Sequence, residues 1–183
     1  MIVEINKKAY QAKEGDNLED VIKQNFKQKN IVAAKVNDKL TDLSDCIEDN
    51  SKVELITTND DDGLNILRHS CAHLFGHAIK QLHPETQMVI GPVIENGFYY
   101  DILSQNPLTE KDLPLIENRM RKLAKKNYSI RREVISKEDA IAIFEGRKEP
   151  YKVELLKEIP EDEVIALYHL SLIHISEPTR QLC

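Results

Sequence analysis

The chain has 183 residues, of which 41% are hydrophobic and 31% are charged, and its formal net charge is −6. This composition is typical of a globular protein with one or two domains, and the negative charge argues against a chain that binds nucleic acid through overall basicity. The three cysteines, an odd number, predict no disulfide framework. The sequence has no signal-peptide pattern and no apolar run long enough to span a bilayer, so we expect a cytoplasmic protein with no membrane partner.

The first sixty residues predict a small sheet with one helix. Short apolar runs separated by turn residues predict strands at Ile2–Ile5, Ala9–Ala12, Ile31–Val36 and Val53–Thr57. An apolar stripe between the second and third runs predicts a helix, capped by Asp16 or Asn17. The order β-β-α-β…β is that of a β-grasp, ubiquitin-like sheet in an α+β fold, a binding module more often than a catalyst. The acidic segment Asn59–Gly63 then predicts a hinge.

Three histidines mark the next predicted element, a helix over Leu64–Leu82 with its apolar residues on one side. His69, His73 and His77 recur every four residues, so we expect them on the opposite, non-core side of that helix. Such neighbours can share a ligand, a water or a metal, although a solvated polar face explains the pattern equally well. A zinc protease is excluded because Leu74 stands where its glutamate base would be, and no clear cluster elsewhere completes a metal site.

The rest of the chain alternates between hairpin, helix and strand patterns. Asn96-Gly97 lies between apolar runs and predicts a hairpin with a type I′ turn. A helix over Leu113–Asn127, with Leu113 among its buried residues, is locally basic, which taken alone we interpret as a solvated helix face. The remaining elements are a capped helix from Ser136, a helical turn from Glu149 and a strand at Ile165–Tyr168.

The last residues have an unusual sequence. The segment Leu170–Arg180 resembles the translated read-through of a transposon-type sequencing adapter. We therefore interpret residues 170–183 as a non-native tail and leave them out of the fold prediction. The expected domains are then residues 1–61, residues 62–169 and this tail.

Four segments carry a further signal: Arg68–His73, His77–Leu82, Gly91–Ile94 and Asn96–Asp101. Together and in this order, they resemble the bacterial threonine–tRNA ligase family. The resemblance implies a TGS domain, which is a β-grasp module, at residues 1–61 and a truncated α/β tRNA-editing domain at residues 62–169. The chain would then be the N-terminal fragment of an ATP-dependent enzyme that attaches threonine to tRNA and hydrolyses seryl-tRNA made in error.

An editing site is expected in such an enzyme because threonine and serine share a hydroxyl and differ by one methyl group, worth about 1–3 kcal/mol of discrimination. The resemblance implies that His73 and His77 activate the water that attacks the ester and contact the terminal ribose. It also implies Lys152 as a further catalytic residue, and Tyr99 and Tyr100 as walls of the substrate site. The family's later Cys-x-x-x-His segment does not occur in this sequence, so we expect the fragment itself to be inactive.

Partners and cofactors follow from the same resemblance. The expected partner is the 3′ acceptor end of tRNA, while ATP and zinc are expected only in the synthetic core of the parent, through which it would form a homodimer. No cofactor and no metal are expected in the fragment. Two alternatives stay open: a non-catalytic RNA-binding β-grasp module, which does not need His73 and His77 to face a cleft, and a free-standing aminoacyl-tRNA deacylase, which needs the missing Cys/His pair.

Overall fold

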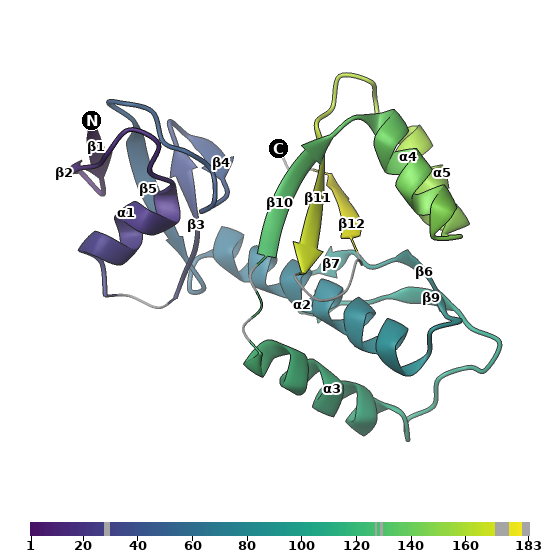
Figure 1. The fold of residues 1–183 in the computed structure, drawn as a ribbon. Coiled ribbons are helices and arrows are strands. Elements are labelled where there is room, and N and C mark those ends of the chain that lie inside the picture. The colour runs from purple at the N-terminus through teal and green to yellow at the C-terminus, as the bar shows by residue number, and fades with distance from the viewer. Residues whose placement is uncertain (28–29, 127, 129, 171–175, 181–183) are drawn as a thin grey trace. The chain divides into compact units, whose positions relative to one another are not determined.

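The computed structural model describes residues 1–27, 30–126, 128, 130–170 and 176–180. The chain divides into two compact units, Met1–Leu67 and Arg68–Leu182, whose elements are labelled in Figure 1. The division falls within helix α2 (Asp61–Leu82), a little beyond the boundary predicted after residue 61. Helices and mostly antiparallel sheets occur in both units, which confirms the predicted α+β class.

The first unit contains a five-stranded mixed sheet in the order β2-β1-β5-β3-β4. Its strands are β1 (Ile2–Ile5), β2 (Lys8–Gln11), β3 (Ile31–Val36), β4 (Lys39–Thr41) and β5 (Lys52–Thr57). The central pair, β1 and β5, is parallel, and the other pairs are antiparallel. The turns at Asn6-Lys7 and Asn37-Asp38 have positive φ at both residues, as type I′ turns require. Strand β4 was not predicted, since three residues after a tight turn give almost no periodic signal.

Helix α1 (Leu18–Asn25) packs on this sheet and closes the first core. The Asn17 side chain accepts a hydrogen bond of 2.8 Å from the backbone N–H of Asp20, which decides between the two predicted caps. The core is formed by apolar residues of the helix, the strands and one loop: Val3, Ile5, Leu18, Val21, Ile22, Ala34, Ile47 and Val53. Burial of each larger side chain contributes about 1.5–3 kcal/mol, so this cluster is what holds the sheet and helix together.

Helix α2 starts at Asp61, so most of the segment predicted as a hinge is helical. The carboxylate of Asp60 accepts two hydrogen bonds from Thr57, one from the backbone N–H at 2.7 Å and one from Oγ1 at 2.8 Å. Gly63 lies so close to strand β5 that a Cβ there would overlap the carbonyl oxygen of Thr57. Lys35 of β3 pairs with Asp62 at 2.7 Å, and this contact raises the pKa of Lys35. The first turn of α2 is thereby fixed to the sheet.

In the second unit, α2 packs beside α3 (Leu113–Lys125) and the strand pair β6 (Gln87–Ile90) and β9 (Asp101–Leu103), as Figure 1 shows. Their shared core contains Ala78, Ile79, Met88, Ile116 and Leu123. Leu113 was expected to be buried, but its side chain is 55% exposed because it lies in the first turn, beyond the contact with α2. The predicted end of this helix at Asn127 lies outside the described residues.

The predicted hairpin is present, but its turn differs from the prediction. Strands β7 (Val93–Ile94) and β8 (Gly97–Phe98) pair so that Ile94 is opposite Gly97. The loop residues are therefore Glu95 and Asn96, and neither has positive φ. A type I′ turn at Asn96-Gly97 is wrong, because the register shifts the turn one residue toward the N-terminus.

The remaining elements of the second unit form a sheet covered by two helices. Strand β10 (Ile130–Ile135) pairs antiparallel with β11 (Ile165–Leu170), and β11 pairs on its other edge with β12 (Ser176–Arg180). Helices α4 (Lys137–Gly146) and α5 (Pro150–Glu158) pack on this sheet through Ala140, Phe144, Val153, Leu156, Ile165 and Leu167. Strand β12 lies in the segment interpreted as a non-native tail, and that interpretation stays a prediction.

Candidate functional site: a cavity that joins an imidazole pair and a buried lysine

A cavity of about 390 Å³ lies in the second unit and is lined by α2, α5 and the segment around β6. Its lining residues are His69, Ala72, His73, Val89, Ile90, Gly91, Pro92, Tyr100, Lys152, Leu155, Glu158 and Ile159. The volume falls within the range of ligand pockets, in which apolar walls surround a few polar groups. Here the polar groups are two imidazoles, one ammonium, one carboxylate and one phenol.

The imidazole pair comes from consecutive turns of α2. The Nε2 atoms of His69 and His73 lie 2.8 Å apart, and the rings meet edge to face with centroids 4.4 Å apart. A separation of four residues places both rings on the same side of a helix, so local geometry alone brings them together. At this distance one Nε2 carries the proton and the other accepts it, because two N–H groups would repel each other.

The third helical histidine lies elsewhere. His77 is only 7% exposed and does not line the cavity. The expectation that all three histidines avoid the interior is wrong for His77, because α2 is enclosed from more than one direction. One side of this helix contacts α3 and β6 through Ile79, and another contributes Ala72 to the cavity wall. In agreement with this, Leu67 and Leu82 of the predicted buried stripe are 46% and 39% exposed.

Lys152 enters the cavity from α5. Its side chain is 5% exposed, and Leu155, Glu158 and Ile159 on the following turns line the same cavity. A buried ammonium is costly unless it has compensating polar contacts, and Lys152 makes an interaction within the protein. One helical turn was predicted from Glu149-Pro150, but the helix that begins there has nine residues. This helix brings Lys152 to the same cavity as His69 and His73 of α2.

The start of α5 is attached to α2 by an ion pair of Lys80, which lies on α2. Lys80 donates to the carbonyl oxygen of Thr86 at 2.9 Å and pairs with the carboxylate of Glu149 at 3.5 Å. The side chains of Lys80 and Glu149 are 18% and 12% exposed. Glu149 is the residue before Pro150, so this partly buried ion pair sets the position of the helix that carries Lys152.

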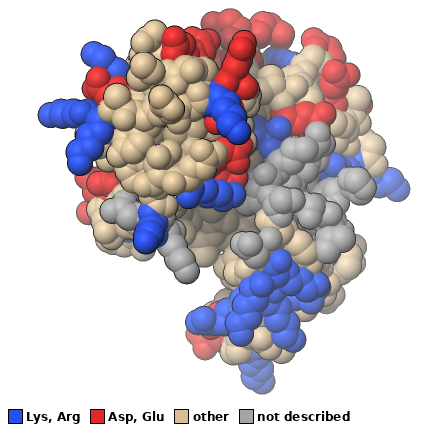
Figure 2. Space-filling model, turned by 60° about the vertical axis from the view of Figure 1, so that its left-hand side comes forward, with Lys and Arg blue, Asp and Glu red and all other residues tan. Residues whose placement is uncertain are grey.

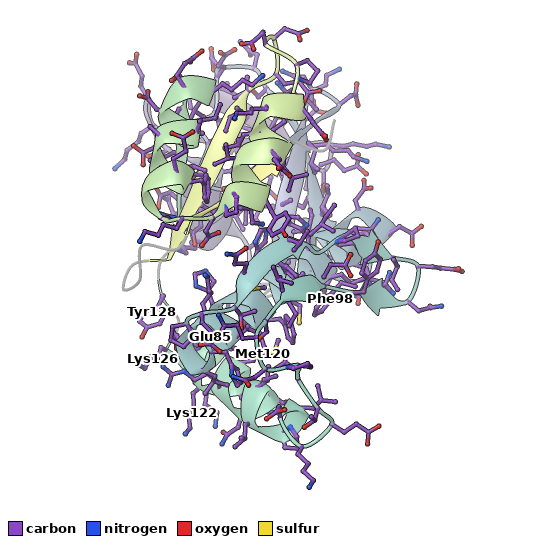
Figure 3. All side chains as sticks on the ribbon, turned by 90° about the vertical axis from the view of Figure 1, so that its right-hand side faces the viewer. Glu85, Phe98, Met120, Lys122, Lys126 and Tyr128 are labelled. Atoms are coloured by element: carbon purple, nitrogen blue, oxygen red, sulfur yellow. The ribbon has the colours of Figure 1, made fainter. Side chains whose placement is uncertain are left out.

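Tyr100 forms another wall, and its ring rests on two supports. The ring lies 5.9 Å from that of Phe75 on α2, and Phe75 also contacts Phe98, labelled in Figure 3, at 6.1 Å. On the other side, a Cβ at Gly91 would be 2.5 Å from two carbons of the Tyr100 ring. Gly91 is therefore needed for close approach rather than for an unusual φ. The adjacent tyrosine, Tyr99, is 48% exposed and does not line the cavity.

A β-bulge shapes the wall next to Gly91. The pairing of β6 with β9 shifts register between Met88 and Ile90, so Val89 is the extra residue. Bulges redirect side chains and are frequent beside functional sites. Val89 lines the cavity, followed by Ile90, Gly91 and Pro92.

Among the described residues, no group of three or more His, Cys, Asp or Glu side chains is arranged to hold a metal ion. Within the same part of the chain, no helix combines the length and apolar character needed to cross a membrane.

Comparison with curated proteins gives this cavity a context. The chain is 49% identical over 138 residues to the threonine–tRNA ligase of Psychrobacter cryohalolentis. The resemblance to threonine–tRNA ligase is confirmed. The matched region covers 75% of this chain but only 21% of that ligase, so the chain spans about a fifth of the length of its relative. No family model matches the chain.

The cavity contains some of the residues that were expected in the site and lacks others. His73, Lys152 and Tyr100 meet in one cavity, whereas His77 and Tyr99 do not line it. Gly91 and Glu158 also contribute to the cavity, although neither was predicted as a site residue. Glu158 lies six residues beyond Lys152 on the same helix, a signal too weak to single it out from the sequence.

Proposed function

We propose that this chain is the N-terminal part of a threonine–tRNA ligase and that the cavity is part of a site for hydrolysis of seryl-tRNA. The single observation that carries the proposal is the meeting of His73 and Lys152 in one cavity, within a chain that is 49% identical to a threonine–tRNA ligase over 138 residues. In this proposal the site receives the 3′ end of a mischarged tRNA, and the cavity holds the seryl ester.

The chemistry is the hydrolysis of an ester. Water attacks the ester carbonyl carbon while an imidazole accepts a proton from that water, and the bond between this carbon and the ribose oxygen then breaks. The ribose oxygen leaves with a proton, so that free serine and deacylated tRNA are formed. His73 is suited to the proton transfer because a ring nitrogen of neutral imidazole can accept a proton and later donate it. Negative charge that develops on the carbonyl oxygen is stabilised by a nearby cation, and Lys152 is the buried cation of this cavity.

Discrimination between the two amino acids is assigned to the walls of this cavity. A hydrolytic site that admits serine can exclude threonine by the volume of its additional methyl group. In a synthetic site, the absence of that methyl group weakens the binding of serine too little to reject it. Tyr100, supported by Phe75 and by the close approach of Gly91, is the most firmly positioned aromatic wall. In this proposal Tyr99 has no contact with the ester. His77, which is buried, contributes to the packing of α2 and does not take part in the reaction.

The first unit and the remaining functions of the parent belong to the same proposal. The elements of the first unit follow the chain order β-β-α-β…β that was predicted for a β-grasp, and α1 packs on their mixed sheet, which supports a TGS module at residues 1–61. ATP-dependent attachment of threonine to tRNA in the cytoplasm, together with its zinc and the homodimer contact, is assigned to parts of the parent outside this chain. The fragment is then expected to lack ligase activity, and ATP–pyrophosphate exchange by the purified chain would contradict this part of the proposal.

The central experiment measures both activities of the full-length enzyme. We expect His73→Ala to slow the hydrolysis of seryl-tRNA by at least about 100-fold, because general acid–base catalysis contributes about 10²–10⁴-fold. Threonine activation, followed by ATP–pyrophosphate exchange, should stay close to the wild-type rate.

The matched control is Tyr99→Phe, which changes an exposed side chain outside the cavity. This variant should keep both activities. Equal loss of hydrolysis and activation in His73→Ala would overturn the editing assignment and would favour a structural role for the histidine. Unchanged hydrolysis in His73→Ala would favour the alternative of a non-catalytic RNA-binding module.

A further inference from the structure

A dense group of cations lies on α3 of this acidic chain, and no residue of α3 lines the cavity. Five cations occur within residues 119–126, namely Arg119, Arg121, Lys122, Lys125 and Lys126, whereas α3 contains one carboxylate, Glu117. Figure 2 shows these Lys and Arg side chains gathered over α3 at the bottom of the view. The five residues are called the α3 cationic surface below.

The helix separates this surface from its apolar side. Ile116 and Leu123 are buried in the core shared with α2, and Met120 packs partly against it. At 100° per residue, Arg121, Lys122 and Lys125 fall on the arc opposite these apolar side chains, whereas Lys126 and the half-buried Arg119 lie at one flank of that arc. Figure 3 agrees with this separation, since Lys122 and Lys126 extend from the outer side of α3 and Met120 lies toward α2.

Two of the cations are already held in place. The Arg119 Nε donates to the Oε1 atom of Gln81 on α2 at 2.5 Å, and the ammonium of Lys126 lies 5.5 Å from the ring centroid of Tyr128. Positioned side chains lose less conformational entropy when a ligand binds. Arg121 pairs with Glu117 at 2.6 Å, but this pair is highly exposed and contributes little stability.

The other two cations have no such internal role. Lys122 and Lys125 are exposed, and no carboxylate among the described residues forms an ion pair with either of them. Glu117 neutralises Arg121, which leaves four positive charges on this surface. Like charges three or four residues apart on a helix repel each other by a few tenths of a kcal/mol per pair. A polyanion bound along this surface would remove that repulsion.

We infer that the α3 cationic surface binds the phosphate backbone of an RNA duplex without reading its sequence. Arg119 to Lys126 span about 10 Å along the helix axis, and about 10 Å of a duplex carries roughly six phosphate charges. The match is therefore one of charge density and length. The choice of RNA as the partner rests on the proposed function, whereas the cationic surface itself does not.

A membrane surface fits these observations less well. A helix that lies on a membrane inserts its apolar face between the lipids, but the apolar face of α3 is already used in the core with α2. The two exposed leucines of α3, Leu113 and Leu115, point in nearly opposite directions around the helix, so they do not form one apolar face.

The test is a binding titration of the full 183-residue chain with a fluorescently labelled RNA hairpin of about twelve base pairs, at several salt concentrations. The test variant is K122Q/K125Q/K126Q, in which glutamine keeps helix propensity. Its affinity should fall at least about tenfold, and the slope of log affinity against log salt should decrease by about one for each phosphate contact removed. The control K7Q/K8Q/K39Q makes the same change of charge at exposed positions of the first unit and should bind like the wild type.

Each outcome decides the inference. It would be overturned by a chain that does not bind the hairpin, by equal weakening in both triple variants, or by tighter binding to vesicles of anionic phospholipid than to RNA. Circular dichroism of the test variant should match that of the wild type, which shows that the total helix content is retained and that loss of binding is not loss of folding. The assay contains no aminoacyl ester, so it fails or succeeds independently of the hydrolysis proposed for the cavity.

Discussion

The imidazoles of His69 and His73 share a hydrogen bond between their Nε2 atoms at 2.8 Å. The bond requires that one ring donates and the other accepts, so the two tautomers are coupled. His69 is thus placed to decide which nitrogen of neutral His73 carries a proton. In a hydrolytic site this choice matters, because only a nitrogen with a free lone pair can accept a proton from water.

We expect His69→Phe to change the tautomer population of His73. Two-bond ¹H–¹⁵N correlation spectra of the chain report the protonation of each ring nitrogen, and the His73 Nε2 signal should shift when its partner is removed. His83→Gln is the control, since His83 does not line the cavity and should leave the His73 signals in place. Identical His73 spectra in the wild type and His69→Phe would show that the two rings are not coupled in solution.

Gly91→Ala should destabilise the second unit by about 1–3 kcal/mol, the usual cost of overpacking. The new Cβ would be 2.5 Å from two carbons of the Tyr100 ring, so the ring or the backbone at residue 91 must shift. The control is Gly146→Ala, where no atom lies within 4 Å of the added Cβ, and it should be neutral or slightly stabilising. Urea denaturation measures both variants.

A double-mutant cycle identifies the cause of the Gly91→Ala effect. In a Tyr100→Ala background the added methyl group meets no ring, so most of its cost should disappear. If the cost of Gly91→Ala were the same with and without the Tyr100 ring, the clash would not be its source.

Phe144→Ala should cost about 3–5 kcal/mol of unfolding free energy, which is typical of removing a buried phenylalanine. Phe144 is fully buried in the cluster that joins α4 and α5 to β11. Chemical denaturation and amide exchange in β11 should both report the loss. Leu115→Ala, at a position 62% exposed on α3, should change stability by no more than about 0.5 kcal/mol.

Asp60 makes stability depend on pH in the acid range. Hydrogen bonds from Thr57, first from its backbone N–H and then from its side chain, hold the pKa of the Asp60 carboxyl below its ordinary value of 3.8. A lowered pKa in the folded state stabilises that state at every pH above the ordinary value, and this contribution is lost as the pH falls through the folded-state pKa. The difference in unfolding free energy between the wild type and Asp60→Asn should therefore be constant from pH 7 to about pH 4 and shrink below that range.

Thr57→Ala provides a graded comparison for Asp60. It removes the hydroxyl donor but keeps the backbone donor, which is the larger cause of the lowered pKa. Its loss of stability at neutral pH should be smaller than that of Asp60→Asn and should show the same pH dependence. A difference between wild type and Asp60→Asn that grows as the pH falls below 4 would contradict the assigned direction of the pKa.

Much of the fold was predictable because local signals and tertiary packing agree. The strand runs at Ile2–Ile5 and Ile31–Val36 and the cap at Asn17 are short-range features that survive in the folded chain. His77 and Leu67 were misplaced, since a helical wheel assumes one buried side and cannot show that a second layer covers another. The turn beside Gly97 was misplaced because its position depends on pairing register, which two residues alone do not specify.

The site was only partly predictable for the same reason. The spacing of His69 and His73 on one helix is local, so the sequence itself indicated that they would be neighbours. The arrival of Lys152 from α5 depends on the contact between Lys80 and Glu149, and the position of Tyr100 depends on a bulge in β6. These are long-range relationships, and no periodicity in the sequence encodes them.

The continuity of α2 across the division at Leu67 sets a rule for chimeric proteins. A crossover placed after residue 61, where the sequence alone divides the chain, would take Asp60 from one parent and Gly63 from the other. Both residues contact Thr57 at the end of β5, Asp60 by hydrogen bonds and Gly63 by close approach. Recombinants that inherit residues 57–67 from one parent should therefore fold, whereas those joined within this segment should lose the contacts that attach α2 to the sheet.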